Sequence, residues 1–210
     1  MAEATALAGK HQIRPLPFNA AGLKGLSERL IVSHHQNNYG GAVRNLNRVE
    51  EELARVTKDT PPPIVAALKE RELTFANSAT LHELYFGNLG GDGRAGAAVE
   101  RALSHAYGSV ARWEEQFRLT GLGLAGGSGW AILTYDVQRR DLRTFWSGNH
   151  TQACASGQPL LVLDMYEHSY ALDYGAAAAK YVDAFFQNIN WDQVEHRLEA
   201  AGRAAQILVG

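Results

Sequence analysis

Three consecutive prolines, Pro61 to Pro63, lie between two long segments of helical periodicity. Apolar and polar residues alternate at a roughly helical period from about 27 to 56, and again from about 64 to 88. Because proline lacks a backbone N–H and its ring clashes with the preceding turn, "TKDTPPP" cannot continue a helix. The two segments therefore predict an antiparallel helical hairpin that ends in the glycine-rich "GGDG".

The second half of the chain has a different pattern. Helical patterns at about 96–106 and 109–119 come first, and three short runs then read as strands, at 130–136, 142–147 and 159–164. Helices at about 171–187 and 191–208 close the chain. The layout predicts the α+β class: an N-terminal helical hairpin domain (1–92) and a C-terminal domain (93–210) with a three-stranded antiparallel sheet and surrounding helices.

The composition narrows the possible partners and compartment. A formal net charge of -2 leaves no basic stripe, so nucleic acid is not expected as a partner. The single cysteine, Cys154, has no partner for an internal disulfide, which favours a reducing compartment. Neither a signal-peptide pattern nor a membrane-length apolar run is visible, so no membrane association and a cytoplasmic location are expected.

Two local motifs are interpreted as non-functional. The stretch "GLGLAG" at 121–126 satisfies the dinucleotide-binding spacing, but it follows a helix and precedes a strand, which is the reverse of the order that phosphate binding needs. Cys154 lies near His150 in sequence, yet nothing places a base, an orienting group and an oxyanion hole around it. A partly buried, inert thiol is the favoured interpretation.

Four residues with metal-binding side chains fall where the predicted fold could bring them together. His34 lies in the first long helix and His82 in the second, while Asp164 and His168 follow the last strand. Three imidazoles and one carboxylate suit iron, manganese or zinc and argue against magnesium or calcium. Isolated histidines are often structural, so spacing alone leaves a metal site and an ordinary strand-to-helix junction both open.

Five motifs resemble the iron/manganese superoxide dismutase family over roughly residues 14–195. "LDMYEHSYALDY" resembles the family's D-V-W-E-H-A-Y-Y signature, and "GGSGWAIL" resembles its G-S-G-W-A-W strand. "FFQNINW" is similar to the F-W-x-x-V-N-W tail. "HHQNNYGGAVRNLN" aligns without a gap with the first ligand helix, and "NSATLHELYF" is similar to the second, N-x-A-x-x-x-N-H-x-x-Y-W.

The resemblance implies the chemistry of the site. The implied ligands of one iron or manganese ion per chain are His34, His82, Asp164 and His168, with solvent as a fifth ligand; iron is favoured. The implied reaction is dismutation of superoxide, a small anion, to dioxygen and hydrogen peroxide. A glutamine usually tunes the metal from one of two places; here these hold Ser78 and His150, so we expect His150 to hydrogen-bond the solvent ligand.

The resemblance also implies an assembly. In the family, the residue equivalent to Glu167 crosses the subunit interface and hydrogen-bonds the partner's metal-ligand histidine, the equivalent of His168. This implies a two-fold homodimer with an isologous contact, or a tetramer built from such dimers.

The substrate funnel departs from the family pattern at five positions. The usual lysine, gateway histidine, gateway tyrosine, paired tyrosine and arginine are replaced by Asn37, Asn38, Ala42, Ala171 and Ala178. Loss of two cations weakens steering of an anionic substrate. Tyr39 could partly refill the funnel and is a candidate catalytic residue. The alternative function is therefore a metalloprotein of this fold with little dismutase activity, repurposed for another small-molecule reaction or for binding.

Overall fold

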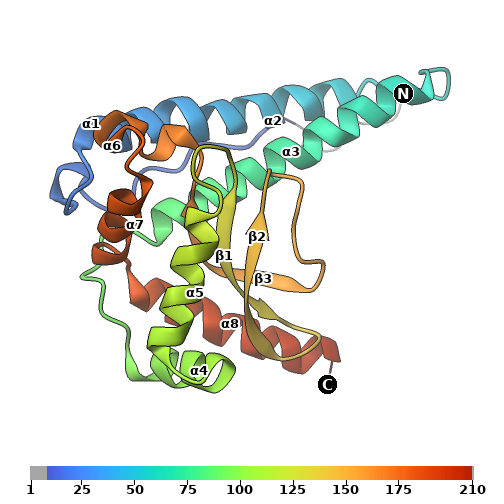
Figure 1. Cartoon of the computed structure of the whole chain (residues 1–210). Coiled ribbons are helices and arrows are strands. Elements are labelled where there is room, and N and C mark those ends of the chain that lie inside the picture. Colours follow the sequence, from blue (N-terminus) through green and yellow to red (C-terminus); the bar gives the residue numbers. More distant parts are fainter. Residues whose placement is uncertain (1–8, 210) are drawn as a thin grey trace.

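The N-terminal half forms the predicted helical hairpin. The computed structural model describes residues 9–209 and contains one nearly continuous helical arm and a second long helix, α3 (Pro62–Gly87), that runs back beside it (Figure 1). The first arm consists of α1 (Glu28–Ser33), the π-helical turn η2 (His34–Tyr39) and α2 (Gly40–Leu53). Two of the three prolines, Pro62 and Pro63, occupy the first positions of α3, where a missing N–H costs nothing.

The first arm is widened at one turn. In η2 the N–H of Gly40 donates to the carbonyl of His35, five residues back, in place of the α-helical spacing of four. The Ser27 hydroxyl caps the start of the arm by accepting from the N–H of Leu30 at 3.1 Å. The short turn η1 (Ala20–Gly22) precedes this cap in the chain.

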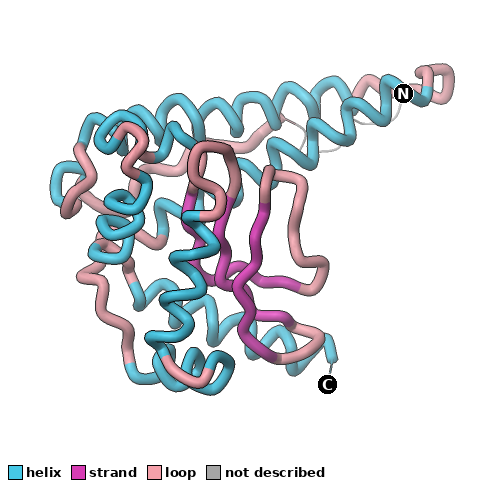
Figure 2. The backbone as a smooth tube through the Cα atoms, in the orientation of Figure 1, coloured by secondary structure: helices cyan, strands magenta, loops and turns pink. Residues whose placement is uncertain are grey.

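The C-terminal half carries the predicted antiparallel sheet in the order β2-β1-β3 (Figure 2). Its strands are β1 (Trp130–Asp136), β2 (Asp141–Ser147) and β3 (Gly157–Asp164), the last starting two residues earlier than predicted. Helices α4 (Ala97–Tyr107), α5 (Val110–Leu122) and α8 (Trp191–Val209) surround it. The α+β prediction is confirmed.

The prediction of one helix over 171–187 is wrong. The segment contains the four-residue α6 (Ala171–Tyr174) and then α7 (Ala178–Gln187). Gly175, at φ +53°, lies between them in a left-handed conformation that an L side chain rarely adopts and that ends α6. A 3-10 turn, η3 (Glu167–Ser169), joins β3 to α6, so the chain reverses tightly just after the sheet.

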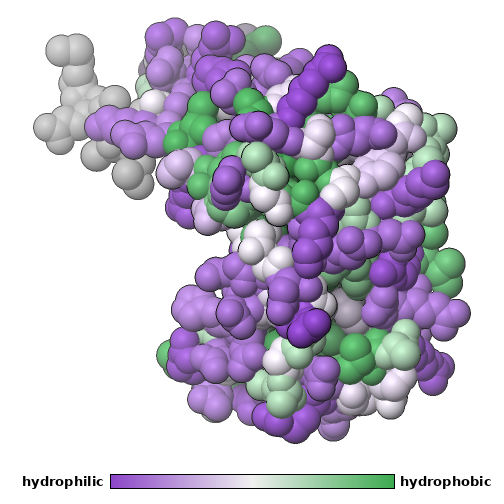
Figure 3. Space-filling model, turned by 90° about the vertical axis from the view of Figure 1, so that its left-hand side faces the viewer, coloured by the Kyte–Doolittle hydropathy of each residue, from purple (hydrophilic) through white to green (hydrophobic). Residues whose placement is uncertain are grey.

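Side chains fill the space between the hairpin and the sheet. Trp130, Tyr85 and Tyr181 are among the largest fully buried side chains, and the inner residues of β3 are buried as a continuous apolar run. Seen from the side in Figure 3, the outline is notched between the upper and lower parts of the molecule, and hydrophobic patches are separated by hydrophilic side chains. No helix within residues 9–209 is long and apolar enough to cross a membrane.

The segment that follows α3 is joined by backbone hydrogen bonds to the connection between α7 and α8. The N–H of Gly91 donates to the carbonyl of Asn188 at 3.0 Å, and the N–H of Gly93 donates to that of Ile189 at 3.1 Å. A Cβ on Gly91 would lie 2.2 Å from the Ile189 carbonyl oxygen, so only glycine permits this approach.

A buried amide ties the same junction to the sheet. The Asn88 side chain donates to the carbonyl of Val162 in β3 at 2.8 Å and accepts from the guanidinium of Arg197 in α8. The Arg197 guanidinium also donates to the carbonyl of Leu160 at 2.8 Å, and burial lowers its pKa to about 10. Three elements therefore share one polar cluster.

We expect Asn88→Ala to lower the free energy of unfolding by about 2–4 kcal/mol, because it removes one neutral hydrogen bond and one to a charged group. Urea denaturation followed by circular dichroism measures the change. Asn37→Ala is the matched control, because Asn37 is exposed and bonds only the Ser33 hydroxyl within the described chain; it should stay within about 0.5 kcal/mol of wild type. If the two variants had equal free energies of unfolding, the Asn88 side chain would not contribute to stability in the way expected.

Candidate metal centre

The structure brings the four predicted metal-binding residues together where the hairpin meets the sheet. His34 is the first residue of η2, His82 lies in the last turns of α3, Asp164 ends β3 and His168 lies in η3. Their nitrogen and oxygen donor atoms all lie within 4.8 Å of one another. Residues separated by up to 134 positions in the sequence thus form one group.

The three imidazoles converge on a single carboxylate oxygen. Asp164 Oδ2 lies 3.1 Å from Nε2 of His34, 3.6 Å from Nε2 of His82 and 3.4 Å from Nε2 of His168. The side chains of His34 and Asp164 are fully buried, while that of His168 is 27% exposed. His168 is therefore the group's point of contact with the surface.

The protonation states suit metal binding. Burial lowers the pKa of His82 to about 3 and also lowers that of His34, so both imidazoles are neutral at neutral pH. Burial alone would raise the pKa of Asp164, but the neighbouring His168 and His34 hold it well below its usual range. His34 and His82 thus offer neutral nitrogen donors beside one carboxylate anion.

The hydrogen bond made by Nδ1 of His82 leaves Nε2 of the neutral ring without a proton. Its Nδ1 lies 2.7 Å from the carbonyl oxygen of Ser78, an acceptor, so the ring proton is on Nδ1 and the lone pair is on Nε2. Nε2 of His82 and Nε2 of His168 are buried and have no hydrogen-bond partner within the described residues. A cation bound between them and Asp164 would satisfy these atoms, so the donor set fits iron, manganese or zinc.

Further hydrogen bonds hold both the carboxylate and the backbone carbonyl of Asp164 in place. The backbone N–H of Tyr166 donates to Asp164 Oδ1 at 2.9 Å, while the hydroxyls of Ser169 and Tyr181 donate to the Asp164 carbonyl at 2.8 and 2.7 Å. The role of Tyr181 could not be predicted from the sequence. Helical periodicity marks its position as buried, but no local signal indicates where its hydroxyl points.

His150 lies beside the group on the connection between β2 and β3. Its ring stacks on Tyr166 with centroids 4.8 Å apart, and its centroid is 6.4 Å from that of His82. The indole N–H of Trp130 donates to His150 Nδ1 at 3.1 Å, so the neutral ring carries its proton on Nε2. Burial lowers the pKa of His150, which favours this neutral form. The sequence reasoning did not identify the Trp130 donor, although the "GSGW" motif marks the position.

Tyr39 uses its hydroxyl elsewhere. The hydroxyl donates to Glu83 Oε1 at 2.9 Å and accepts from the backbone N–H of Arg14 at 2.9 Å, and burial raises its pKa to about 12. The ring still lies near the group, with its centroid 6.3 Å from that of His82. The structure therefore brings the Tyr39 ring close to the centre and engages its hydroxyl with Glu83 and Arg14; its catalytic role stays a prediction.

The substituted funnel positions are distributed unevenly. Asn37 and Ala171 are exposed and Asn38 is half-buried, whereas Ala42 and Ala178 are buried. Glu167, one residue before His168, is exposed.

Comparison with known proteins relates the chain to one enzyme family. Residues 95–197 match the sequence model of "Iron/manganese superoxide dismutases, C-terminal domain". The iron superoxide dismutase of Cupriavidus metallidurans is 47% identical over 92% of this chain and 98% of its own length. Superoxide dismutase [Mn] 1 of Halobacterium salinarum is 33% identical over 91% of this chain and 96% of its own length.

A further relative shows similar coverage. The iron superoxide dismutase of Aquifex aeolicus is 32% identical over 95% of this chain and 97% of its own length. Both halves of the chain are thus matched, and the matched region includes the hairpin and the sheet whose junction holds the four donor side chains. This chain belongs to the iron/manganese superoxide dismutase family.

Proposed function

We propose that this chain is a superoxide dismutase that binds one iron or manganese ion per chain through His34, His82, Asp164 and His168. The observation that carries the proposal is the convergence of three buried imidazole Nε2 atoms on one oxygen of a buried carboxylate. An iron or manganese ion at this point supplies one-electron redox chemistry, by which two superoxide anions and two protons become dioxygen and hydrogen peroxide. The protein would serve an antioxidant role.

The residues of the chain hold the site and protect it. Asp164 supplies the only carboxylate among the four donors, so it offsets one charge of a divalent or trivalent ion and the loaded site keeps a net positive charge. That charge favours a small anion such as superoxide. Aromatic rings surround His34: the centroids of Tyr85 and Phe86 lie 5.2 and 5.0 Å from it, which limits solvent access on that side.

His150 is proposed to tune the site as a hydrogen-bond donor. Its Nδ1 is occupied as the acceptor of the Trp130 indole, which leaves Nε2–H as the available donor. Its carbonyl accepts from the side-chain amide of Asn77 in α3 at 2.7 Å, so both the ring and the backbone of His150 are held. A held donor beside a metal site adjusts its reduction potential and delivers protons along a fixed direction.

Iron is the proposed metal. The 47% identical relative is named for iron, which supports this choice, although another relative of high coverage is named for manganese. The ligand set does not separate the two metals, because the groups around the ligands determine the preference.

A homodimer is proposed as the active assembly, with Glu167 at the interface. Glu167 is exposed beside His168 and has no ion-pair partner within the described residues of its own chain, and Leu172 nearby is 46% exposed. A carboxylate that reaches the partner's His168 would fit a two-fold, isologous contact. We place this assembly in the cytoplasm, where a chain with a single cysteine needs no disulfide.

The proposed function is tested by metal analysis and superoxide consumption on the same sample, after reconstitution with iron and separately with manganese. We expect about one metal per chain and fast turnover with one of the two metals. His168→Ala should lose most of the metal and the activity, since Nε2 of His168 is one of the converging donors. His105→Ala, an exposed histidine of α4, is the control and should retain both.

Unchanged metal content in His168→Ala would contradict the ligand assignment. Stoichiometric metal with negligible turnover would support the alternative, a repurposed site behind the substituted funnel positions Asn37, Asn38, Ala42, Ala171 and Ala178.

His150→Gln should retain the metal but change activity by about 10- to 100-fold, because the ring donor beside the site is replaced by an amide with different reach and acidity. Redox titration of the loaded protein and steady-state superoxide consumption measure the effect. A potential and an activity equal to those of wild type would place His150 outside the groups that act on the metal.

Glu167→Ala should shift the protein from dimer toward monomer in analytical ultracentrifugation. We expect the dissociation constant of the dimer to rise at least tenfold, a loss of about 1.4 kcal/mol of binding free energy. Glu100→Ala, at the start of α4, supplies the control for loss of one exposed carboxylate. An unchanged dimer in Glu167→Ala would remove Glu167 from the proposed interface.

A further inference from the structure

A cavity of about 500 Å³ lies apart from the metal centre, between α3 and the sheet. It is bordered by α3, by all three strands and by the connection from β2 to β3 (residues 148–156). None of the four metal-binding residues lines it, and neither does His150. The volume falls in the range of about 300–1,000 Å³ that is typical of small-molecule sites.

The side chains that line the cavity determine which ligands it suits. None of them is charged. Apolar and aromatic groups predominate, among them Leu81, Ile132, Phe145 and Trp146, and uncharged amides from Asn77 and Gln152 supply hydrogen-bonding groups. Because burying an ion without a countercharge is costly, such a cavity selects neutral molecules with a ring and few polar atoms.

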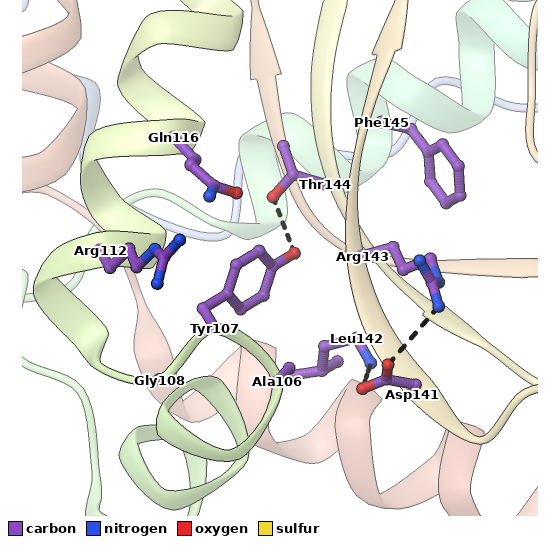
Figure 4. Close-up of a pocket in the computed structure, with 10 residues that line it drawn as sticks. All are labelled: Ala106, Tyr107, Gly108, Arg112, Gln116, Asp141, Leu142, Arg143, Thr144 and Phe145. Carbon is purple, nitrogen blue, oxygen red and sulfur yellow. Dashed lines mark hydrogen bonds and ion pairs between the residues drawn. The ribbon is translucent and has the colours of Figure 1, made fainter.

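A second cleft of about 590 Å³ provides a contrast. It lies where α4 and α5 meet β2, and its lining includes Arg112, Arg143 and Asp141 (Figure 4). In that cleft the Tyr107 and Thr144 hydroxyls are already hydrogen-bonded to each other at 3.1 Å, and Arg143 lies 3.7 Å from Asp141. The cleft of Figure 4 thus contains charged side chains, whereas the lining of the cavity beside α3 contains none.

Two side chains at the uncharged cavity, Trp146 and Cys154, are accessible to a ligand. Trp146, at its border, is 58% exposed and offers an indole face to a ligand. The half-buried thiol of Cys154, the only cysteine of the chain, also lines it. An aromatic ligand would cover the indole and shield the thiol together.

The cavity shares residues with the support of His150. Asn77 lines it and donates to the carbonyl of His150 at 2.7 Å. Ser147 lines it, and its hydroxyl lies 2.6 and 2.7 Å from the carbonyl oxygens of Asn149 and Gln152, which share its single proton. A ligand that moves Asn77 or Ser147 therefore acts directly on the connection that carries His150.

We infer that this cavity binds a neutral aromatic small molecule, and that its occupancy is transmitted through Asn77 and Ser147 to His150 and the metal centre. Binding is independent of the proposed function. The transmission rests on the proposed function, because it uses His150 beside a loaded metal site.

Binding is tested on the metal-loaded protein with N-phenyl-1-naphthylamine, a neutral aromatic fluorophore. We expect saturable fluorescence enhancement at one site per chain, with quenching of the exposed Trp146, and at least fivefold slower alkylation of Cys154 by iodoacetamide. Ala153→Phe places a ring in the cavity and should weaken binding at least tenfold. Ala155→Phe, exposed on the same connection but outside the lining, is the matched control and should bind as wild type does.

The transmission is tested by the visible absorption of the bound metal, which does not require turnover. Saturating probe should change this spectrum in wild type and in Ala155→Phe but not in Ala153→Phe. Absent saturable binding, or equal affinity in the two variants, overturns the cavity assignment. Binding with an unaltered metal spectrum overturns the transmission. A loaded protein that binds the probe but fails to consume superoxide contradicts the proposed function and supports the cavity.

Discussion

The convergence of three imidazole nitrogens on Asp164 Oδ2 is the interaction on which the rest of the structure depends. A carboxylate with no exposed surface has lost its hydration, and the imidazole nitrogens that face it do not compensate that loss in full. A bound cation compensates both the anion and the unpartnered nitrogens. The hairpin must therefore pack against the end of β3 closely enough to bring His34 and His82 to the same oxygen.

Separate parts of the chain hold the donor residues and the proposed tuning residue. The backbone carbonyl of Asp164 accepts hydrogen bonds from Ser169 in η3 and from Tyr181 in α7, both of which follow it in the chain. His150 instead lies on a connection, where Trp130 and Asn77 hold its ring and its backbone. A change in the connection can thus alter the surroundings of the metal without displacing a ligand.

The features that could be predicted from the sequence are those with a local cause. Consecutive prolines predict the end of one helix and the start of the next, and alternating apolar runs predict the three strands. The break at Gly175 was missed because the four alanines that follow it, at 176–179, strongly favour helix. The direction of the Tyr39 hydroxyl depends on Glu83 and on Arg14, which are far from it in sequence, so periodicity could not reveal it.

The π-helical turn at His34–Tyr39 determines how the two ends of the first arm are rotated relative to each other. Each residue advances an α-helix by about 100°, so the extra residue in this turn offsets the phase of the faces before and after it. Exchange of the side chains at Asn37 and Asn38 leaves that offset intact. Regular α-helical winding of the same residues would turn α2 by about 100° relative to His34, and either His34 or the buried stripe of α2 would then face the wrong direction. In this arm, the wide turn allows His34 and the buried stripe of α2 to face the core together.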